Sequence, residues 1–481
     1  MSKKKQKSIE ELLEEALVPE EEQPYSLPEN WVWVRLKSIN KDKKRNIDPR
    51  DYSEEVFELY SVPSYDLGEP EYIKGKEIGS NKQVVKENEI LLCKINPRIN
   101  RVWIVLNNRG KYRQLASTEW IVISENKVIY PKYLLFLLKA PYFRKLITSN
   151  VSGVGGSLTR AKPKEVETYP IALPPLNEQK RIAEKIERLF AKIDEAKRLI
   201  EEVKESFERR RAAILDKAFK GQLGTNDPNE ESMLETSNGI KEKNLVPKEE
   251  QPYEVPKNWV WVRVGDLVEL ERGITFPSSA KKDKREERLI GCARTANVQD
   301  EFRWDDLIYV DKKYLKNNDK KLLRKGDIVM STANSYYLVG KVSYIHELIE
   351  PITFGGFIMS IRAKNPVNQK FLYYYFREQF LNGKVQKLAS QTTNIANLNG
   401  KKIKSLSLPL PPLNEQKRIV ERLDKLLGKL DEQEEMVLEV EQKLDLLKQS
   451  ILNKAFRGEL GTNDPNDEHA IELLKEALKS Q

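Results

Sequence analysis

The sequence predicts an α+β fold in which two globular α/β segments are separated by two long antiparallel coiled-coil helices, with pseudo-twofold and pseudo-cyclic symmetry. The main observation is that PPLNEQKRI stands at 174–182 and again 237 positions later, at 411–419. Each copy leads into a long charged pattern with helical spacing, and each pattern closes on a version of AFKGQLGTNDPN. A repeat at a fixed offset indicates a duplicated half-molecule.

The two long patterns carry apolar residues at alternating steps of four and three, which predicts a heptad seam and a left-handed supercoil. We expect Asn177 or Asn414 to cap the first turn of each helix, and Gly221 or Gly458 to follow its end. Each helix is expected to pair with the other, and pairing with a second copy or another protein is the alternative. The predicted seam residues are Ile182, Ile186, Leu189, Ile193, Ile200, Val203 and Phe207, then Ile419, Leu423, Leu426, Leu430, Val437, Val440 and Leu444, with Arg210 also on the grid.

A second repeat marks where each globular segment begins. LPENWVWVRLKSI starts at Leu27 and VPKNWVWVRVGDL at Val255, and the alternating WVWV predicts an opening strand. The last helical pattern, from Ile471, resembles the first, from Ile9, which predicts that the two ends of the sequence lie near each other. The predicted parts are an N-terminal helix and connector (1–23), globular segments (24–173 and 252–410), long helices (174–221 and 411–458), a linker (222–251) and a C-terminal helix (459–481).

Composition excludes a membrane protein and favours a cytoplasmic one. The 481 residues are 39% hydrophobic and 33% charged, without the run of about 18 apolar residues that a spanning helix needs. The start is basic and then acidic, unlike a secretory signal. Cys93 and Cys292 lie in separate halves, so no disulfide is predicted.

The net charge of +9 is concentrated in the globular segments, which carry +8 and +10, while the helices and connecting parts are near neutral or acidic. Two basic segments indicate two contacts with a polyanion. The motifs of common enzymes are missing: there are two histidines, no CxxC pair and no GxGxxG, and GVGGSLTR from Gly153 lacks the lysine of a phosphate loop. We therefore predict no catalytic residue and no metal site.

Cationic and amide side chains gather at the predicted tips of both globular segments. Arg and Lys pair with guanine acceptors and Asn and Gln with adenine in the major groove, so these tips are candidates for DNA recognition. The first tip offers Lys82, Lys94, Asn96, Arg98, Asn100 and Arg101, followed by Ser157, Thr159 and Arg160 after a glycine cluster. The second offers Arg272, Arg294, Asn334, Tyr336, Gln391, Thr392, Thr393 and Asn394.

Two variable globular segments, each closed by LPPLNEQKRI and a long helix, resemble the specificity subunit of type I restriction-modification enzymes over nearly the whole chain. INPRINRVW and GVGGSLTRA also resemble one class of target recognition domain in that family, whereas the second segment lacks these two motifs. The resemblance implies that 24–173 and 252–410 each read one half of a split, asymmetric site in double-stranded DNA.

The same resemblance implies that the helices act as a spacer and as a docking surface for two methyltransferase (M) subunits, with restriction/translocase (R) subunits joining the complex. Adenine methylation and ATP-dependent cleavage would belong to these partners, so S-adenosylmethionine, ATP and Mg²⁺ are expected only there. Three alternatives stay open: a self-sufficient nuclease or methyltransferase, a coiled-coil scaffold without a nucleic-acid role, and a freestanding DNA-binding repressor.

Overall fold

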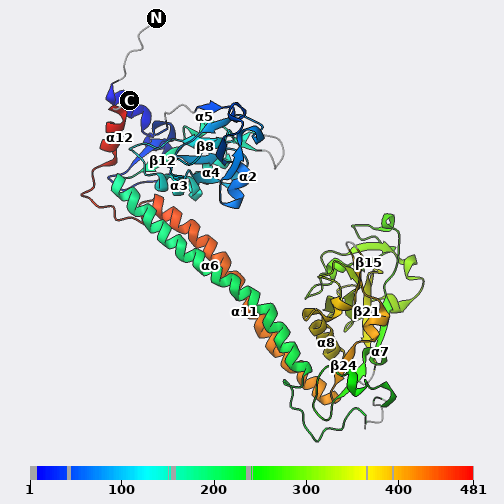
Figure 1. The fold of residues 1–481 in the computed structure, drawn as a ribbon. Coiled ribbons are helices and arrows are strands. Elements are labelled where there is room, and N and C mark those ends of the chain that lie inside the picture. Colours follow the sequence, from blue (N-terminus) through cyan, green and yellow to red (C-terminus); the bar gives the residue numbers. More distant parts are fainter. Residues whose placement is uncertain are drawn as a thin grey trace. The chain divides into compact units, whose positions relative to one another are not determined.

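A computed structural model describes residues 8–40, 45–149, 151–152, 159–234, 240, 242–364, 367–392 and 395–479. The chain forms two compact units, one made of residues 1–199 with 439–481 and the other of residues 200–438. Both long helices, α6 (Leu176–Phe219) and α11 (Leu413–Phe456), contribute to both units (Figure 1). Within the described ranges, every helix is too short or too polar to cross a bilayer.

The first unit combines mixed sheets with short helices. A five-stranded sheet has the order β2-β5-β8-β3-β4, a three-stranded sheet has the order β7-β6-β9, and the pairs β1-β12 and β10-β11 are separate. Its strands are β1 (Val32–Arg35), β2 (Asn46–Ile47), β3 (Val56–Tyr60), β4 (Glu71–Lys74), β5 (Lys82–Val84), β6 (Ile90–Cys93), β7 (Val102–Ile104), β8 (Arg113–Ser117), β9 (Trp120–Ile123), β10 (Val151–Ser152), β11 (Arg160–Ala161) and β12 (Pro170–Leu173). Its helices are α1 (Ile9–Ala16), α2 (Val62–Leu67), α3 (Pro131–Lys139), α4 (Pro141–Ser149), α5 (Pro163–Val166) and α12 (Ala470–Lys479).

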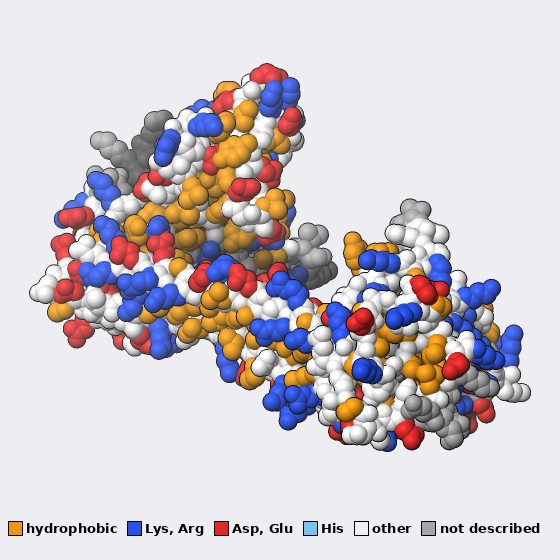
Figure 2. All heavy atoms as spheres, turned by 60° about the horizontal axis from the view of Figure 1, so that its bottom comes forward, with side chains coloured by type: hydrophobic (Ala, Val, Ile, Leu, Met, Phe, Trp, Pro, Cys, Tyr) orange, Lys and Arg blue, Asp and Glu red, His pale blue; other side chains and the backbone are white. Residues whose placement is uncertain are grey.

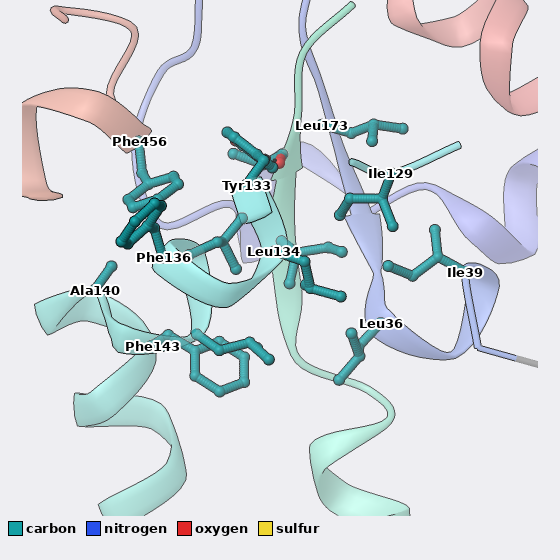
Figure 3. Close-up of a cluster of buried hydrophobic side chains, with 14 of the residues drawn as sticks. Leu36, Ile39, Ile129, Tyr133, Leu134, Phe136, Ala140, Phe143, Leu173 and Phe456 are labelled. Atoms are coloured by element: carbon teal, nitrogen blue, oxygen red, sulfur yellow. Dashed lines mark hydrogen bonds between the residues drawn. The ribbon is translucent and has the colours of Figure 1, made fainter. Parts of the chain in front are cut away.

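The core of the first unit surrounds α3 (Figure 3). The apolar face of this helix buries Leu134 and Leu137, and Tyr133 lies with its ring centroid 5.3 Å from that of Phe456. Phe456 is the last residue of α11, so the end of the second long helix is part of the core of the first unit. Burial of each such side chain contributes about 1.5–3 kcal/mol.

The second unit repeats this plan with different sheets. A four-stranded sheet has the order β14-β21-β17-β19, and three-stranded sheets have the orders β16-β15-β20 and β18-β23-β22, beside the pair β13-β24. The strands are β13 (Val260–Arg263), β14 (Val268–Arg272), β15 (Leu289–Ala293), β16 (Ile308–Asp311), β17 (Ile328–Ser331), β18 (Ala333–Asn334), β19 (Val342–Tyr344), β20 (Ile352–Phe354), β21 (Ile358–Ala363), β22 (Ser390–Gln391), β23 (Ala396–Asn397) and β24 (Ser407–Leu410). The helices are α7 (Val264–Leu267), α8 (Gln369–Leu381), α9 (Lys384–Leu388) and α10 (Gly400–Lys404).

The predicted opening strands are confirmed. β1 pairs with β12, and β13 pairs with β24, in each case with the strand that leads into a long helix. The Trp33 indole donates to the Tyr25 carbonyl at 2.9 Å, and the Tyr25 hydroxyl donates to the Phe456 carbonyl at 3.0 Å. The second unit has the same pair of bonds, from Trp261 to Tyr253 and from Tyr253 to Phe219.

The repeated motif holds the start of each long helix. In the first unit, the buried Glu178 carboxylate accepts from the Asn463 backbone N–H at 3.0 Å and from the Thr462 hydroxyl at 2.7 Å. Glu415 accepts from Asn226 and Thr225 in the second unit, at 2.9 Å each. The GTNDPN loop after one long helix therefore binds the beginning of the other.

The predicted helix ends are correct at one end and wrong at the other. Gly221 and Gly458 follow the helices with φ of +71° and +77° and close them as glycines in the left-handed region do. Asn177 and Asn414 were predicted as caps, but α6 and α11 begin at Leu176 and Leu413, so these asparagines lie inside the first turn.

The two long helices pair antiparallel within the chain, as predicted. In the first unit Lys197 pairs with Asp445 at 2.5 Å and Lys448 pairs with Asp194. In the second unit the buried Arg211 guanidinium contacts Asp431 at 2.5 Å and Glu434 at 2.6 Å. Burial alone would lower the pKa of Arg211, but its carboxylate partners outweigh burial and raise it.

The predicted heptad register holds for part of the seam. Ile182, Ile186, Ile193, Phe207, Ile419, Leu423 and Leu430 are buried, and Leu189, Ile200, Leu426, Val437 and Leu444 are partly buried. Val203 and Val440 are 38% and 47% exposed, so their assignment to the seam was wrong. Arg210 is exposed as well, and its neighbour Arg211 is buried instead.

The reason is the drift of a straight α-helix against a strict seven-residue repeat. Some buried positions lie eleven or twenty-two residues apart, such as Ile182, Ile193 and Leu215 in α6, whereas Ile186, Ile193 and Phe207 keep the seven-residue spacing. The buried face therefore follows the heptad repeat over part of each helix and departs from it elsewhere.

Two further predictions concern the chain ends and the cysteines. α1 and α12, from opposite ends of the sequence, pack against each other in the first unit, as predicted (Figure 1). Cys93 and Cys292 are buried free thiols, and burial raises the pKa of Cys292 to about 12.

Candidate nucleic-acid interface

The tip of the first globular segment joins two stretches that are far apart in the sequence. After β6, Ile95 forms a bridge with Arg160, the Asn96 N–H donates to the Thr159 carbonyl at 2.8 Å, and the Ala161 N–H donates to the Lys94 carbonyl at 2.8 Å. KINPRINR and the residues after the glycine cluster therefore form one surface, which we call the first tip (94–101 with 159–161).

A tight turn presents the middle of the first tip. Asn96 and Asn100, with φ of +46° and +56°, flank a single 3-10 turn at Pro97–Ile99. Asn tolerates this left-handed conformation better than most residues. Arg98 lies exposed at the apex, and its carbonyl accepts from the Arg144 guanidinium at 2.6 Å, which ties the turn to α4.

A carboxylate that sequence reasoning missed lies under the first tip. Glu119, in the turn between β8 and β9, accepts from the Arg160 guanidinium at 3.1 Å and lies 3.9 Å from the Lys94 ammonium. The side chains of Lys94, Glu119 and Arg160 are 24%, 25% and 54% exposed. A lone Glu before a tryptophan carries no recognisable motif, so only the fold reveals this ionic cluster.

Three acceptor oxygens at the first tip are buried and, within the described part of the chain, lack a hydrogen bond: Asn96 Oδ1, Asn100 Oδ1 and Glu119 Oε2. Buried acceptors in native proteins are normally satisfied.

Two predicted contacts of the first segment are engaged elsewhere. Arg101 forms two 3.0 Å hydrogen bonds with Asp66, and its side chain is 12% exposed. Lys82 is buried and donates to Ser80, and burial lowers its pKa. The prediction of a DNA contact is therefore not supported for Lys82, because its ammonium lies inside the segment.

The second tip has the same backbone plan. Beyond β17, β18 pairs with β23, and β23 pairs with β22, so Asn334 and Gln391 both lie opposite Ala396. The Thr392 hydroxyl donates to the Ile395 carbonyl at 3.0 Å. Tyr336 is 36% exposed in the loop that follows Asn334. The second tip (331–338 with 390–392 and 395–398) thus brings four of the predicted residues together.

Arg272 and Arg294 lie instead in a pocket of about 380 Å³ between β14, β15 and the turn before β21. Arg272 donates to the Gly356 carbonyl at 2.9 Å, and Arg294 donates to the Asp306 carboxylate at 2.7 Å. The sequence predicted these two side chains as contacts without predicting a pocket.

Ser157, Thr393 and Asn394 fall outside the described residues. Among the side chains that the structure does describe, no group of three or more His, Cys, Asp or Glu residues is placed to hold a metal ion.

Known proteins resemble the chain over most of its length. The model of the type I restriction modification DNA specificity domain matches residues 28–205 and 256–441. The EcoAI type I restriction enzyme specificity subunit of Escherichia coli is 24% identical over 88% of this chain and 81% of its own length. The MjaVIII specificity subunit of Methanocaldococcus jannaschii is 25% identical over 92% of this chain and 95% of its own length.

Two solved structures share the fold. A structure concerned with complex assembly and conformational transition of the type I R-M system has a TM-score of 0.71 at 24% identity, over 91% of this chain and 100% of that one. The HsdS subunit from Thermoanaerobacter tengcongensis has a TM-score of 0.55 at 24% identity, with the same coverage. Because the family model matches both halves of the chain, the protein belongs to the type I restriction modification DNA specificity domain family.

Proposed function

We propose that the protein is the DNA sequence-specificity subunit of a type I restriction-modification complex. Each globular segment reads one half of a bipartite, asymmetric site, and the subunit directs partner methyltransferase and restriction subunits to it. The observation that carries the proposal is that one backbone plan is used twice, with different side chains at the equivalent tip positions. Two tips that share a backbone plan but carry different side chains can read two different half-sites, as an asymmetric site requires.

Charge supports a DNA partner. The two globular segments carry +8 and +10, and exposed cations such as Arg98 and Arg160 lie at the first tip. In DNA-binding proteins, phosphate contacts by Lys and Arg side chains supply much of the affinity and make it fall steeply with salt. Base-edge contacts by Asn and Arg side chains would then select the sequence.

The chain itself is proposed to be non-catalytic and cytoplasmic. Adenine methylation, with S-adenosylmethionine, and ATP- and Mg²⁺-dependent cleavage are assigned to the two M subunits and the R subunits. The long helices supply a surface for such partners: Leu446 and Leu447 are 63% and 47% exposed in the first unit, and Met436 and Leu438 are 56% and 45% exposed in the second. Figure 2 shows hydrophobic side chains among charged ones on the surface, the paired helices included.

The test is to map methylated adenines across a genome in cells that express the M subunits with and without this chain. We expect methylation at one split sequence only when the chain is present. DNA cleavage or cofactor binding by the purified chain alone would support the self-sufficient enzyme instead, and indifference to DNA in the presence of the M subunits would support the scaffold. Tight sequence-specific binding without partners would support the repressor.

The length of the helices is proposed to set the gap between half-sites. Inserting four residues into α6, and four more at the facing position of α11, lengthens the helix pair by about 6 Å. The preferred gap in the methylation map should grow by one or two base pairs, and an unchanged gap would contradict this role.

A further inference from the structure

The pocket that holds Arg272 and Arg294 has a lining suited to an aromatic anion. Its walls include Phe276, Phe357, Ile274 and Ile308, and none of the described residues that line it is acidic. At about 380 Å³ it falls in the range of roughly 300–1,000 Å³ that is usual for small-ligand sites.

The cations in this pocket retain donor capacity. Arg272 uses Nε on the Gly356 carbonyl, and Arg294 uses Nη2 on Asp306. The Arg294 Nε is buried and, among the described residues, has no hydrogen-bond partner. A guanidinium carries five N–H donors, so both side chains can still bind an acceptor in the pocket.

The pocket is joined to the second tip by hydrogen bonds between Phe357, which lines the pocket, and Thr332, which belongs to the tip. The Phe357 carbonyl accepts from the Thr332 N–H at 2.8 Å and from the Thr332 hydroxyl at 3.0 Å. The Thr332 carbonyl in turn accepts from the Leu398 N–H at 2.8 Å. The Phe357 side chain is 63% exposed, so an aromatic ring stands at the boundary between the pocket and the candidate reading surface.

We propose that this pocket binds one unstacked nucleotide of the DNA half-site that the second segment reads. The base stacks on Phe357 and Phe276, and Arg272 and Arg294 bind its phosphate or its acceptor atoms. Proteins that hold an extruded base use this combination of apolar or aromatic walls and polar donors. The inference rests on the proposed function and deepens it, because it adds a recognition site beside the second tip.

A free mononucleotide has the same chemistry as an unstacked one. The exposed position of Phe357 next to Thr332 favours a nucleotide of the bound DNA (the DNA source) over a free one. A nucleotide that leaves a duplex bound on the second tip would pass this ring first. The two sources differ in a measurable way, since only the DNA source unstacks a base.

The experiment uses the full chain in complex with its M subunits on a duplex that carries the mapped site. Each position of the second half-site is replaced in turn by 2-aminopurine, and thymines are probed with permanganate. We expect an unstacked base at one position other than the methylated adenine. Phe357→Ala should remove this signal and weaken specific binding about tenfold, while the signal of the methylated position stays unchanged.

The matched control is Ile349→Ala, which removes a side chain that is 73% exposed in the same segment but does not line the pocket. It should leave both signals unchanged. Two results would overturn this inference and leave the proposed function intact. One is sequence-specific binding without an extra unstacked base, and the other is an unstacked base that persists in Phe357→Ala. Loss of all sequence-specific binding in the wild-type complex would overturn the proposed function with it.

A second experiment uses equilibrium dialysis to measure how the four deoxynucleoside monophosphates bind to the wild-type complex and to the complex with Phe357→Ala. Binding that depends on Phe357, in a complex whose DNA shows no extra unstacked base, would assign the pocket to a free nucleotide and overturn the DNA source. Weak or absent binding of monophosphates together with the unstacked base would support the inference.

Discussion

The surroundings of the two tips differ at one pair of equivalent backbone positions, Glu119 and Phe357. In the first tip the Lys94 N–H donates to the Glu119 carbonyl at 3.1 Å, and in the second the Thr332 N–H donates to the Phe357 carbonyl at 2.8 Å. The same backbone turn therefore presents a carboxylate with two cations in one segment and an exposed aromatic ring in the other. The comparison teaches that the scaffold fixes where the side chains stand and leaves their chemistry free to differ.

Where each globular segment meets the long helices, the two units agree closely. Glu178 and Glu415 accept equivalent hydrogen bonds, and Tyr25 and Tyr253 donate equivalent ones. If this division between a shared scaffold and unlike tips is correct, scaffold substitutions should have equal effects in both units, and tip substitutions should affect one half-site only.

The largest effect is expected from the buried carboxylates of the scaffold. Glu178→Ala and Glu415→Ala should each lower the free energy of unfolding by about 4 kcal/mol, because each leaves two donors of a GTNDPN loop without their acceptor. Each also removes one of the two carboxylates that contact a nearby arginine, which keeps Asp467 in the first unit and Glu230 in the second. Urea denaturation measures the loss, and hydrogen exchange locates it in the first or the second unit.

The controls for this pair are Glu184→Ala and Glu421→Ala, which remove exposed carboxylates one or two turns further along the same helices. They should change stability by less than about 0.5 kcal/mol. Clearly unequal losses for Glu178→Ala and Glu415→Ala would break the claim of a common scaffold.

A slightly smaller effect tests the register of the long helices. Leu427 is 3% exposed, whereas its neighbour Leu426, the heptad position, is only partly buried. Leu427→Ala should cost about 3 kcal/mol and Leu426→Ala about 1 kcal/mol in thermal or urea unfolding. A larger loss of stability in Leu426→Ala than in Leu427→Ala would instead support the strict heptad seam.

A substitution at one tip should affect recognition of only the half-site that this tip reads. Arg160→Ala removes an exposed guanidinium of the first tip and should weaken discrimination at the first half-site by about 2 kcal/mol, with no change at the second. Competition binding to duplexes altered in one half-site at a time measures this.

Arg109→Ala is the matched control for Arg160→Ala, because Arg109 is exposed in the same segment but follows the far end of β7. It should have at most a small, sequence-independent effect. Equal loss at both half-sites in Arg160→Ala would show that the two segments do not read DNA separately.

The smallest expected effect is the change in stability at low pH that depends on Asp300. In the second unit Asp300 lies 3.3 Å from Lys341 and 3.6 Å from Arg377. Burial raises the pKa of Asp300, but Arg377 and Lys341 outweigh it, so the pKa lies below its ordinary value of 3.8. A lowered folded pKa means that the contribution to stability is complete above the ordinary value and is lost as the pH falls through the folded value.

The stability difference between the wild type and Asp300→Asn should therefore be constant from about pH 7 to about pH 5 and shrink below about pH 4. Urea denaturation at several pH values measures it. A difference that grows as the pH falls would contradict the assigned ion pairs.

The repeats made most of the fold predictable. Exact duplication of PPLNEQKRI and WVWV located the long helices and the opening strands, because a duplicated sequence must form the same element twice. The seam was less predictable, since periods of about 3.5 and about 3.67 residues per turn diverge only after several turns. Val203 and Val440 are two heptad positions at which burial departs from the strict repeat.

The tips were predictable as places and not as contacts. Runs such as KINPRINR are rich in cations and amides, but the sequence does not show that Arg101 is held by Asp66 or that Lys82 is buried. Glu119 and Phe357 reach the tips only through tertiary folding, because each stands in a different strand connection from the residues that it contacts.

The discontinuous makeup of the first unit sets an order for folding during synthesis. Residues 200–438 form the second unit from one continuous stretch, whereas the first unit also needs residues 439–481, which leave the ribosome after that stretch. The second unit can therefore complete its core while the first 199 residues still lack Phe456 and the loop that binds Glu178. A nascent chain stalled while residues 439–481 still lie in the ribosomal exit tunnel should protect the second unit from protease and leave the beginning of α6 open to cleavage.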